Sequence, residues 1–123
     1  MIAEALVAHL MNQMMCEREP DFSVTIGLLQ KANLIEGETN GLSMFGADFC
    51  YNALGTVFLV DGMEIGIVCG NPETRIDFYI MEGRDVVNKW LPKKSASELK
   101  GFPGGTRVSC KANSMNGHFK SED

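Results

Sequence analysis

A cysteine in the segment Leu42 to Gly55 stands where a predicted strand runs into a predicted helix. Cys50 would open that helix, so its thiol and the unbonded N–H groups of the first turn would face the same space. A helix N-terminus carries roughly half a positive charge, which favours a bound carboxylate and lowers the pKa of a nearby thiol. A carboxylate site beside an activated thiol is suited to removing a proton from the carbon next to that carboxylate.

The run Gly46-Ala47-Asp48-Phe49-Cys50-Tyr51-Asn52-Ala53 resembles the G-[GN]-E-F-C-G-N-A segment of the diaminopimelate epimerase-like superfamily. These amino-acid racemases and epimerases need no pyridoxal phosphate. Within the superfamily, the pattern is most similar to that of the histidine racemases of opine metallophore pathways. The resemblance extends over about Ile2 to Pro92, because the helix and strand before the motif and the strands after it have a similar spacing.

The resemblance implies an α+β fold: one lobe with a mostly antiparallel sheet wrapped around a central helix. It also implies a cofactor-independent isomerase in which two cysteines act as base and acid and invert the α-carbon of an amino acid. Cys50 would be one catalytic thiol. Tyr51 and Asn52 would offer backbone N–H groups to the substrate carboxylate, together with the Asn52 side chain.

Tyr51 and the family segments that would lie outside this sequence favour an alternative, whereas Asp48 is a milder departure from the family pattern. Tyr51 replaces a glycine and would crowd the carboxylate, and Asp48 replaces the commoner glutamate. The family's first strand and its second lobe, with the partner cysteine, would lie outside Met1 to Asp123, so we expect one lobe that pairs with a second lobe or forms a homodimer. The alternative is a non-catalytic lobe that binds an amino acid or a partner chain, and a weaker one is a redox-sensing thiol protein.

Composition excludes several other classes. The chain has 123 residues and a net charge of −5, which is a poor match for a nucleic-acid backbone. It has neither an apolar run of the roughly 18 residues needed to cross a membrane nor a signal peptide, so we expect a cytoplasmic protein without a membrane partner. The four cysteines lack metal-ligand spacing, so no metal site is expected. In the cytoplasm they should be reduced, and apart from Cys50 they should act as small buried hydrophobes.

Hydrophobic periodicity predicts the elements that must position Cys50. Residues 1–92 form the predicted lobe, and residues 93–123 form a polar, Gly-rich tail that is partly ordered. Helices are expected over residues 2–15 and 49–60, and strands over residues 22–28, 42–45, 64–69, 75–81 and 85–91, the last three as antiparallel neighbours. His9 falls among apolar positions of the first helix and should be a packed residue rather than a base.

Overall fold

Three helices and six strands make up the part of the chain that the structure, a computed structural model, describes, namely residues 3–37, 49–72, 74–92 and 95–112. All strand pairs are antiparallel, so the α+β class with an antiparallel sheet is confirmed. In chain order the elements are α1 (Glu4–Met15), α2 (Phe22–Lys31), β1 (Phe49–Asn52), β2 (Phe58–Val60), β3 (Met63–Asn71), β4 (Arg75–Ile80), α3 (Arg84–Trp90), β5 (Glu98–Phe102) and β6 (Gly105–Lys111).

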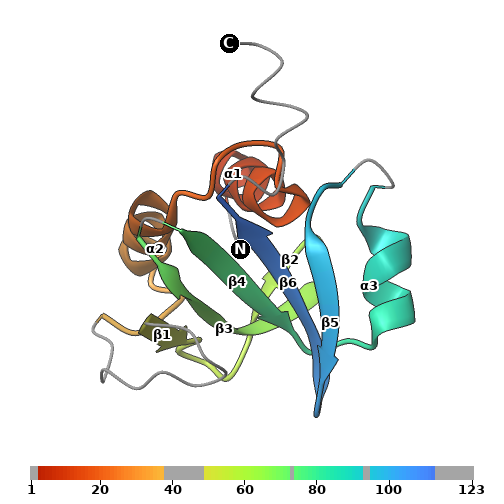
Figure 1. Cartoon of the computed structure of the whole chain (residues 1–123). Coiled ribbons are helices and arrows are strands. Elements are labelled where there is room, and N and C mark those ends of the chain that lie inside the picture. The colour runs from red at the N-terminus through yellow and green to blue at the C-terminus, as the bar shows by residue number, and fades with distance from the viewer. Residues whose placement is uncertain (1–2, 38–48, 73, 93–94, 113–123) are drawn as a thin grey trace, which may run out of the picture.

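The sheet has the strand order β1-β3-β4-β6-β5 (Figure 1). The short strand β2 pairs with the beginning of β3, next to the stretch that pairs with β1. Asp61 and Gly62 join β2 to β3 with φ values of 48° and 85°, and positive φ at both positions defines the type I′ turn that Asp-Gly favours. An irregularity between Ile65 and Ile67 separates the two halves of β3, as a β-bulge does.

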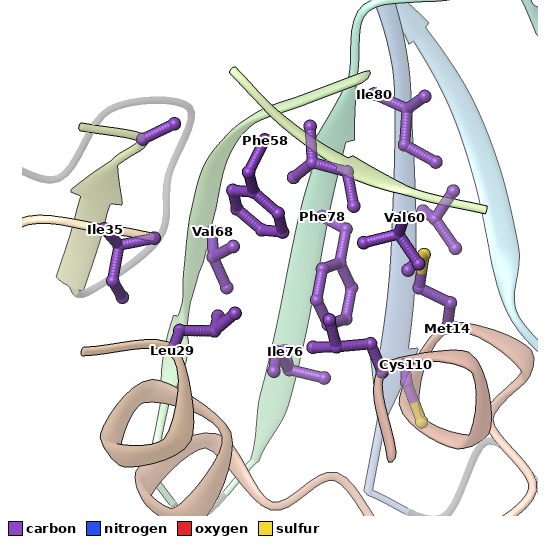
Figure 2. Close-up of a cluster of buried hydrophobic side chains, with 14 of the residues drawn as sticks. Met14, Leu29, Ile35, Phe58, Val60, Val68, Ile76, Phe78, Ile80 and Cys110 are labelled. Carbon is purple, nitrogen blue, oxygen red and sulfur yellow. The ribbon is translucent and has the colours of Figure 1, made fainter. Parts of the chain in front are cut away.

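One face of the sheet carries the main hydrophobic core. Helices α1 and α2 pack against this face through Leu10, Met14, Ile26 and Leu29, and β2 contributes Phe58 and Val60 to the same core. Figure 2 shows side chains from both helices and from β2 packed against those of the central strands. The core includes Leu10, Met14, Ile26, Leu29, Phe58, Val60, Val68, Ile76, Phe78, Ile80, Val87 and Val108.

The first predicted helix is confirmed as α1, although Ile2 lies outside the described residues. It ends at Cys16, which has φ of 58°. The N–H groups of Cys16 and Glu17 bond back to the carbonyls of Gln13 and Asn12, which is the Schellman arrangement.

Three other predictions of element type are wrong. Residues 22–28 form helix α2 instead of a strand, residues 49–60 contain strands β1 and β2 instead of a helix, and residues 85–91 lie mainly in helix α3 instead of a strand. The expected central helix around Cys50 is therefore replaced by two strands. In α3 the buried residues are Val87 and, at its end, Leu91, and a spacing of four residues places them on one face of a helix.

The strands predicted at residues 64–69 and 75–81 are confirmed as β3 and β4, which are antiparallel neighbours. The next neighbour of β4 is β6, because Ile76 to Ile80 pair with Cys110 to Thr106. Strands β5 and β6 both come from the stretch interpreted as a polar tail. The predicted strand at 42–45 lies outside the described residues.

All four cysteines are paired in disulfides, so the expectation of reduced thiols is wrong. Cys16 at the end of α1 bonds to Cys110 on β6, with a Cα–Cα distance of 5.2 Å. Cys50 on β1 bonds to Cys69 on β3, with a Cα–Cα distance of 4.1 Å. Among the described residues, no helix is long and apolar enough to cross a membrane.

Candidate binding site on the second face of the sheet

Cys50, the predicted catalytic residue, lies in the middle of strand β1 and is only 7% exposed. It stands directly opposite Cys69 on β3, which is fully buried. Both sulfur atoms belong to the disulfide. In this oxidised state Cys50 has no thiol proton to give and no thiolate to accept one. A role in proton transfer therefore requires that the disulfide first be reduced.

The side chains of Tyr51 and Asn52 point to opposite faces of the sheet, because successive side chains of a strand alternate between its two faces. Tyr51 packs against the main core, where its ring centroid lies 6.1 Å from that of Phe22. The backbone N–H of Asn52 donates to Glu36 Oε1 over 3.2 Å, and its side-chain amide approaches the same oxygen at 3.5 Å. In this structure the amide groups of Asn52 therefore contact a carboxylate of the chain itself, whereas the predicted contact with a substrate carboxylate stays a prediction.

A group of polar side chains lies on the second face of the sheet, the face turned away from α1 and α2. On β4, Asp77 and Tyr79 alternate with the core residues, and on β6 Arg107 and Ser109 do the same. Asp77 stands directly opposite Ser109, and Tyr79 stands directly opposite Arg107. Directly opposed Cβ atoms lie roughly 5 Å apart, and diagonal ones roughly 7–8 Å. The four residues therefore form one compact group.

Three polar atoms of this group are buried and have no hydrogen-bond partner among the residues that the structure describes. They are Asp77 Oδ1, Arg107 Nε and Ser109 Oγ. Asp77 and Ser109 are each only 2% exposed. A buried polar atom without a partner costs about 1–3 kcal/mol, so three on neighbouring strands are an unusual concentration that calls for an explanation.

Together with the neighbouring Arg75 and Lys100, this group carries a net positive charge. Arg75 Nε lies 2.9 Å from Asp77 Oδ2, so one carboxylate oxygen is already paired. Arg107 has no carboxylate partner within the described ranges. Lys100, which stands directly opposite Arg107 on β5, adds a further positive charge. On a chain with a net charge of −5, this positive region favours a bound anion.

Tyr79 remains a neutral phenol at ordinary pH. Burial raises the pKa of Tyr79 above its usual 10.0, and the negative charge of Asp77 raises it further, while the Arg107 guanidinium lowers it. The ring of Tyr79 also makes an edge contact with Phe102, with centroids 5.1 Å apart. The phenol thus contributes no charge to the group.

Apolar side chains flank the polar group on the same face. The Cys50–Cys69 disulfide and Tyr79 form a small buried cluster, against which Ile67, Met81 and Phe102 pack while still partly exposed. Cys69 stands directly opposite Asp77. A ligand held by the polar group would thus lie between charged residues and an apolar, sulfur-containing surface.

Sequence interpretation missed this group because it treated residues 75–81 only as an apolar strand. One signal was available: Asp77 interrupts an otherwise apolar run in a segment predicted to be a strand, and buried carboxylates are rare without a partner. Arg107 and Ser109 gave no signal, because their segment was assigned to the tail and its pairing with β4 could not be foreseen.

His9 is held in place by a hydrogen bond, as expected for a packed helix residue. Its Nε2 lies 2.8 Å from Thr25 Oγ1 on α2. Burial lowers the pKa of His9 below its usual 6.5, and the nearby Asp21 carboxylate partly opposes this effect. His9 packs between α1 and α2, and the second face is the opposite side of the sheet.

No protein-family model matches the chain, and comparisons with curated proteins and with solved structures found no match. Within the described residues, no group of three or more His, Cys, Asp or Glu side chains is placed to hold a metal ion.

Proposed function

We propose that this protein is a disulfide-stabilised, non-catalytic module that binds a free α-amino acid on the second face of its sheet. The observation that carries the proposal is the set of three unpartnered buried atoms, Asp77 Oδ1, Arg107 Nε and Ser109 Oγ. Asp77 Oδ1 can only accept a hydrogen bond and Arg107 Nε can only donate one, while the Ser109 hydroxyl can do either.

The three atoms complement the two charged groups of an α-amino acid. The ligand carboxylate would accept from Arg107 Nε and Ser109 Oγ, and the ligand ammonium would donate to Asp77 Oδ1. A simple anion would satisfy Arg107 but would be repelled by Asp77, and a simple amine would be repelled by Arg107. Because Asp77 and Ser109 are almost fully buried, the ligand can reach them only if longer neighbouring side chains, such as the half-buried Arg75, move aside.

Calorimetric titration with L-leucine tests the proposal, since the half-buried Ile67, Met81 and Phe102 favour an apolar side chain. Two analogues isolate the charged groups: 3-methylbutylamine lacks the carboxylate, and 4-methylpentanoate lacks the ammonium. We expect L-leucine to bind more tightly than either analogue. Equal binding of 4-methylpentanoate would show that Asp77 is not used and would contradict the proposal, as would the absence of binding by any common L-amino acid.

A matched pair of variants tests the location. Arg107→Gln and Lys100→Gln each remove one positive charge from directly opposed positions on β6 and β5. Arg107 carries an unpartnered buried nitrogen, whereas Lys100 is exposed. We expect Arg107→Gln to abolish measurable binding and Lys100→Gln to leave the affinity within about threefold, which corresponds to less than about 1 kcal/mol. Equal losses would point to a diffuse charge effect instead of a site.

A second candidate function is the predicted racemase activity of an epimerase-like lobe, in the reduced chain. The observation that favours it is the position of Cys50 and Cys69 on the same face as Asp77 and Ser109, where their thiols would lie beside a bound amino acid. Incubation of the reduced protein with L-histidine and other L-amino acids in heavy water tests this candidate. It predicts deuterium at the α-carbon, and this exchange should be lost in Cys50→Ser. No exchange with any of these amino acids would reject it.

The two disulfides favour an oxidising compartment over the predicted cytoplasm, because structural disulfides are rare in cytosolic proteins. We therefore propose that binding takes place where both disulfides are formed. Quantification of free thiols in protein isolated from its native source under thiol-blocking conditions would test this. We expect no free thiols.

A further inference from the structure

Strand β5 is an end strand of the sheet, and its outer edge has no strand beside it among the described residues. On its inner side β5 pairs with β6 along its whole length, from Glu98 opposite Ser109 to Phe102 opposite Gly105. In an antiparallel edge strand, alternate residues direct their N–H and C=O groups away from the partner strand. The opposite edge of the sheet, formed by β1, differs from this one. Directly after β1, Ala53 pairs with Ile35 in an isolated antiparallel β-bridge.

A groove lies between helix α3 and the segment that includes Leu99 of β5. Figure 1 shows α3 alongside β5, and the two elements are in contact. The groove has a volume of about 840 Å³. Apolar side chains of Leu91, Pro92 and Leu99 line it together with polar ones of Asn88, Ser95 and Ser97. An edge strand next to a helix, with a partly apolar groove between them, is the arrangement that accepts an extended peptide as an added strand.

The charges at the groove indicate the kind of partner. Arg84 and Lys89 line its α3 side, against a single lining carboxylate, Asp85. On β5, Lys100 is exposed, while Glu98 is paired with Lys111 over 3.4 Å. The groove is therefore locally positive on a chain whose net charge is −5. This charge complements an acidic segment.

A second copy of the chain is a poor occupant. Two copies related by a two-fold axis would bring the same edge together. Antiparallel pairing of β5 with itself, centred on its middle residue, would place Lys100 directly opposite Lys100, and like charges in that position are destabilising.

We infer that β5 and α3 form a docking groove for an extended acidic segment of a partner protein, which adds to the sheet as a strand next to β5. Main-chain hydrogen bonds to β5 would provide affinity. Arg84 and Lys89 would select acidic side chains, and Leu91 and Leu99 would contact the alternating apolar ones. This groove is separate from the proposed amino-acid site, which is formed by β4 and β6.

The test is a titration of the isotope-labelled full chain, followed by NMR, with a capped peptide of alternating Glu and Val about eight residues long, the upper range of a strand. We expect chemical-shift changes concentrated in residues 84–91 and 98–102. Two control peptides isolate the interactions: one carries N-methyl groups on alternate residues and cannot pair with an edge, and the other has Lys in place of Glu. Both should bind at least about tenfold more weakly, a difference of about 1.4 kcal/mol.

Matched charge reversals complete the test. Lys89→Glu should weaken binding of the Glu-Val peptide by about tenfold, or about 1.4 kcal/mol, whereas Lys31→Glu, at the exposed end of α2, should not change it. Equal binding of the N-methylated peptide, or shift changes that map outside α3 and β5, would overturn the inference. A dimer whose formation protects the amides of residues 98–102 would also overturn it, because a second copy would then occupy the edge.

Discussion

Ser109 illustrates how a single buried hydroxyl can weaken the free protein and strengthen its complex. Its Oγ is buried and has no partner in the described part of the chain, so the free chain loses the hydration of this hydroxyl and gains no hydrogen bond there in return. If a ligand supplies the missing bond, the cost is recovered only on binding. The same reasoning applies to Arg107 Nε and Asp77 Oδ1.

Ser109→Ala should therefore have opposite effects on stability and binding. Removal of an unpartnered hydroxyl should raise the free energy of unfolding of the free protein by about 1 kcal/mol, and loss of a ligand hydrogen bond should weaken L-leucine binding by about 1 kcal/mol. Urea denaturation and calorimetry measure the two effects.

Ser97→Ala is the matched control for this experiment. The Ser97 hydroxyl lies 2.6 Å from Ser95 Oγ, so its removal should lower stability by about 1 kcal/mol and leave the binding of L-leucine unchanged. A loss of stability in Ser109→Ala similar to that in Ser97→Ala would contradict the assignment of Ser109.

His9 should make stability depend on pH near neutrality. Because burial lowers the pKa of His9 in the folded state below the 6.5 of the unfolded chain, the unfolded chain binds more protons between these two values. The contribution of neutral His9 to the free energy of unfolding is complete above pH 6.5. It is lost as the pH falls through 6.5 toward the lowered pKa of the folded state. Denaturation curves for the wild type and His9→Gln measure it. The variant should lose less stability on acidification across this window, and parallel profiles would contradict the prediction.

Among the elements, α2 shows why a short apolar pattern can be misread. Phe22, Val24, Ile26 and Leu28 alternate as in a strand, but the buried residues are Phe22, Thr25, Ile26 and Leu29, which follow the helical period. Two helix-start signals preceded them. Pro20 and Asp21 stand before the first turn, and the Asp21 side chain accepts a bond from the Val24 N–H, as N-cap residues do.

The opposite error affected the segment around Cys50. Apolar residues at Phe49, Ala53 and Val57 match a helical period, but the intervening Gly55 and Thr56 favour an interruption, and Thr56 has φ of 81°. Pairing with β3 then determines the outcome. Such long-range pairing overrides local propensity, so the strand state of Cys50, and its disulfide with Cys69, could not be predicted from the local pattern.

Strand β1 should depend on its disulfide more than the rest of the sheet does. It lies at an edge, and Cys50–Cys69 closes a loop with a sequence separation of 19, for which loop entropy predicts about 3 kcal/mol of stabilisation. In Cys50→Ala/Cys69→Ala, hydrogen exchange should speed up first at residues 49–52, while the amides of β4 and β6 stay protected. Uniform acceleration across the sheet would contradict this view.

For the whole molecule, the Cys16–Cys110 disulfide joins the first helix to the last strand, with a sequence separation of 94. A loop of this length predicts about 4–5 kcal/mol of stabilisation. Cys16→Ala/Cys110→Ala should therefore lower the free energy of unfolding by more than the other double variant does, and in one cooperative transition. Urea denaturation of both double variants provides the comparison, and the reverse order would contradict it.

The parts of the molecule that could be predicted are those determined by local pattern. The stripe of α1 and the β3–β4 pair, with the turn predicted at Gly70-Asn71-Pro72, were recognisable from spacing and turn residues. The candidate site was not recognisable, because it depends on the pairing of β4 with β6, which begins 25 residues after the end of β4. This pairing brings Ser109 and Arg107 opposite Asp77 and Tyr79. Cys50 was predicted to be a reactive thiol. It lies beside this group, but its sulfur is bonded to Cys69 in a disulfide.

The Nε–H group of Arg107 reports directly on the proposed binding, because its NMR signal can be followed as L-leucine is added to the oxidised protein. We expect this proton to move to lower field and to exchange more slowly with solvent as the ligand carboxylate accepts its hydrogen bond. The change should persist in Lys100→Gln and weaken in Ser109→Ala. An Arg107 Nε–H signal that stays unchanged at saturating L-leucine would contradict the proposed site.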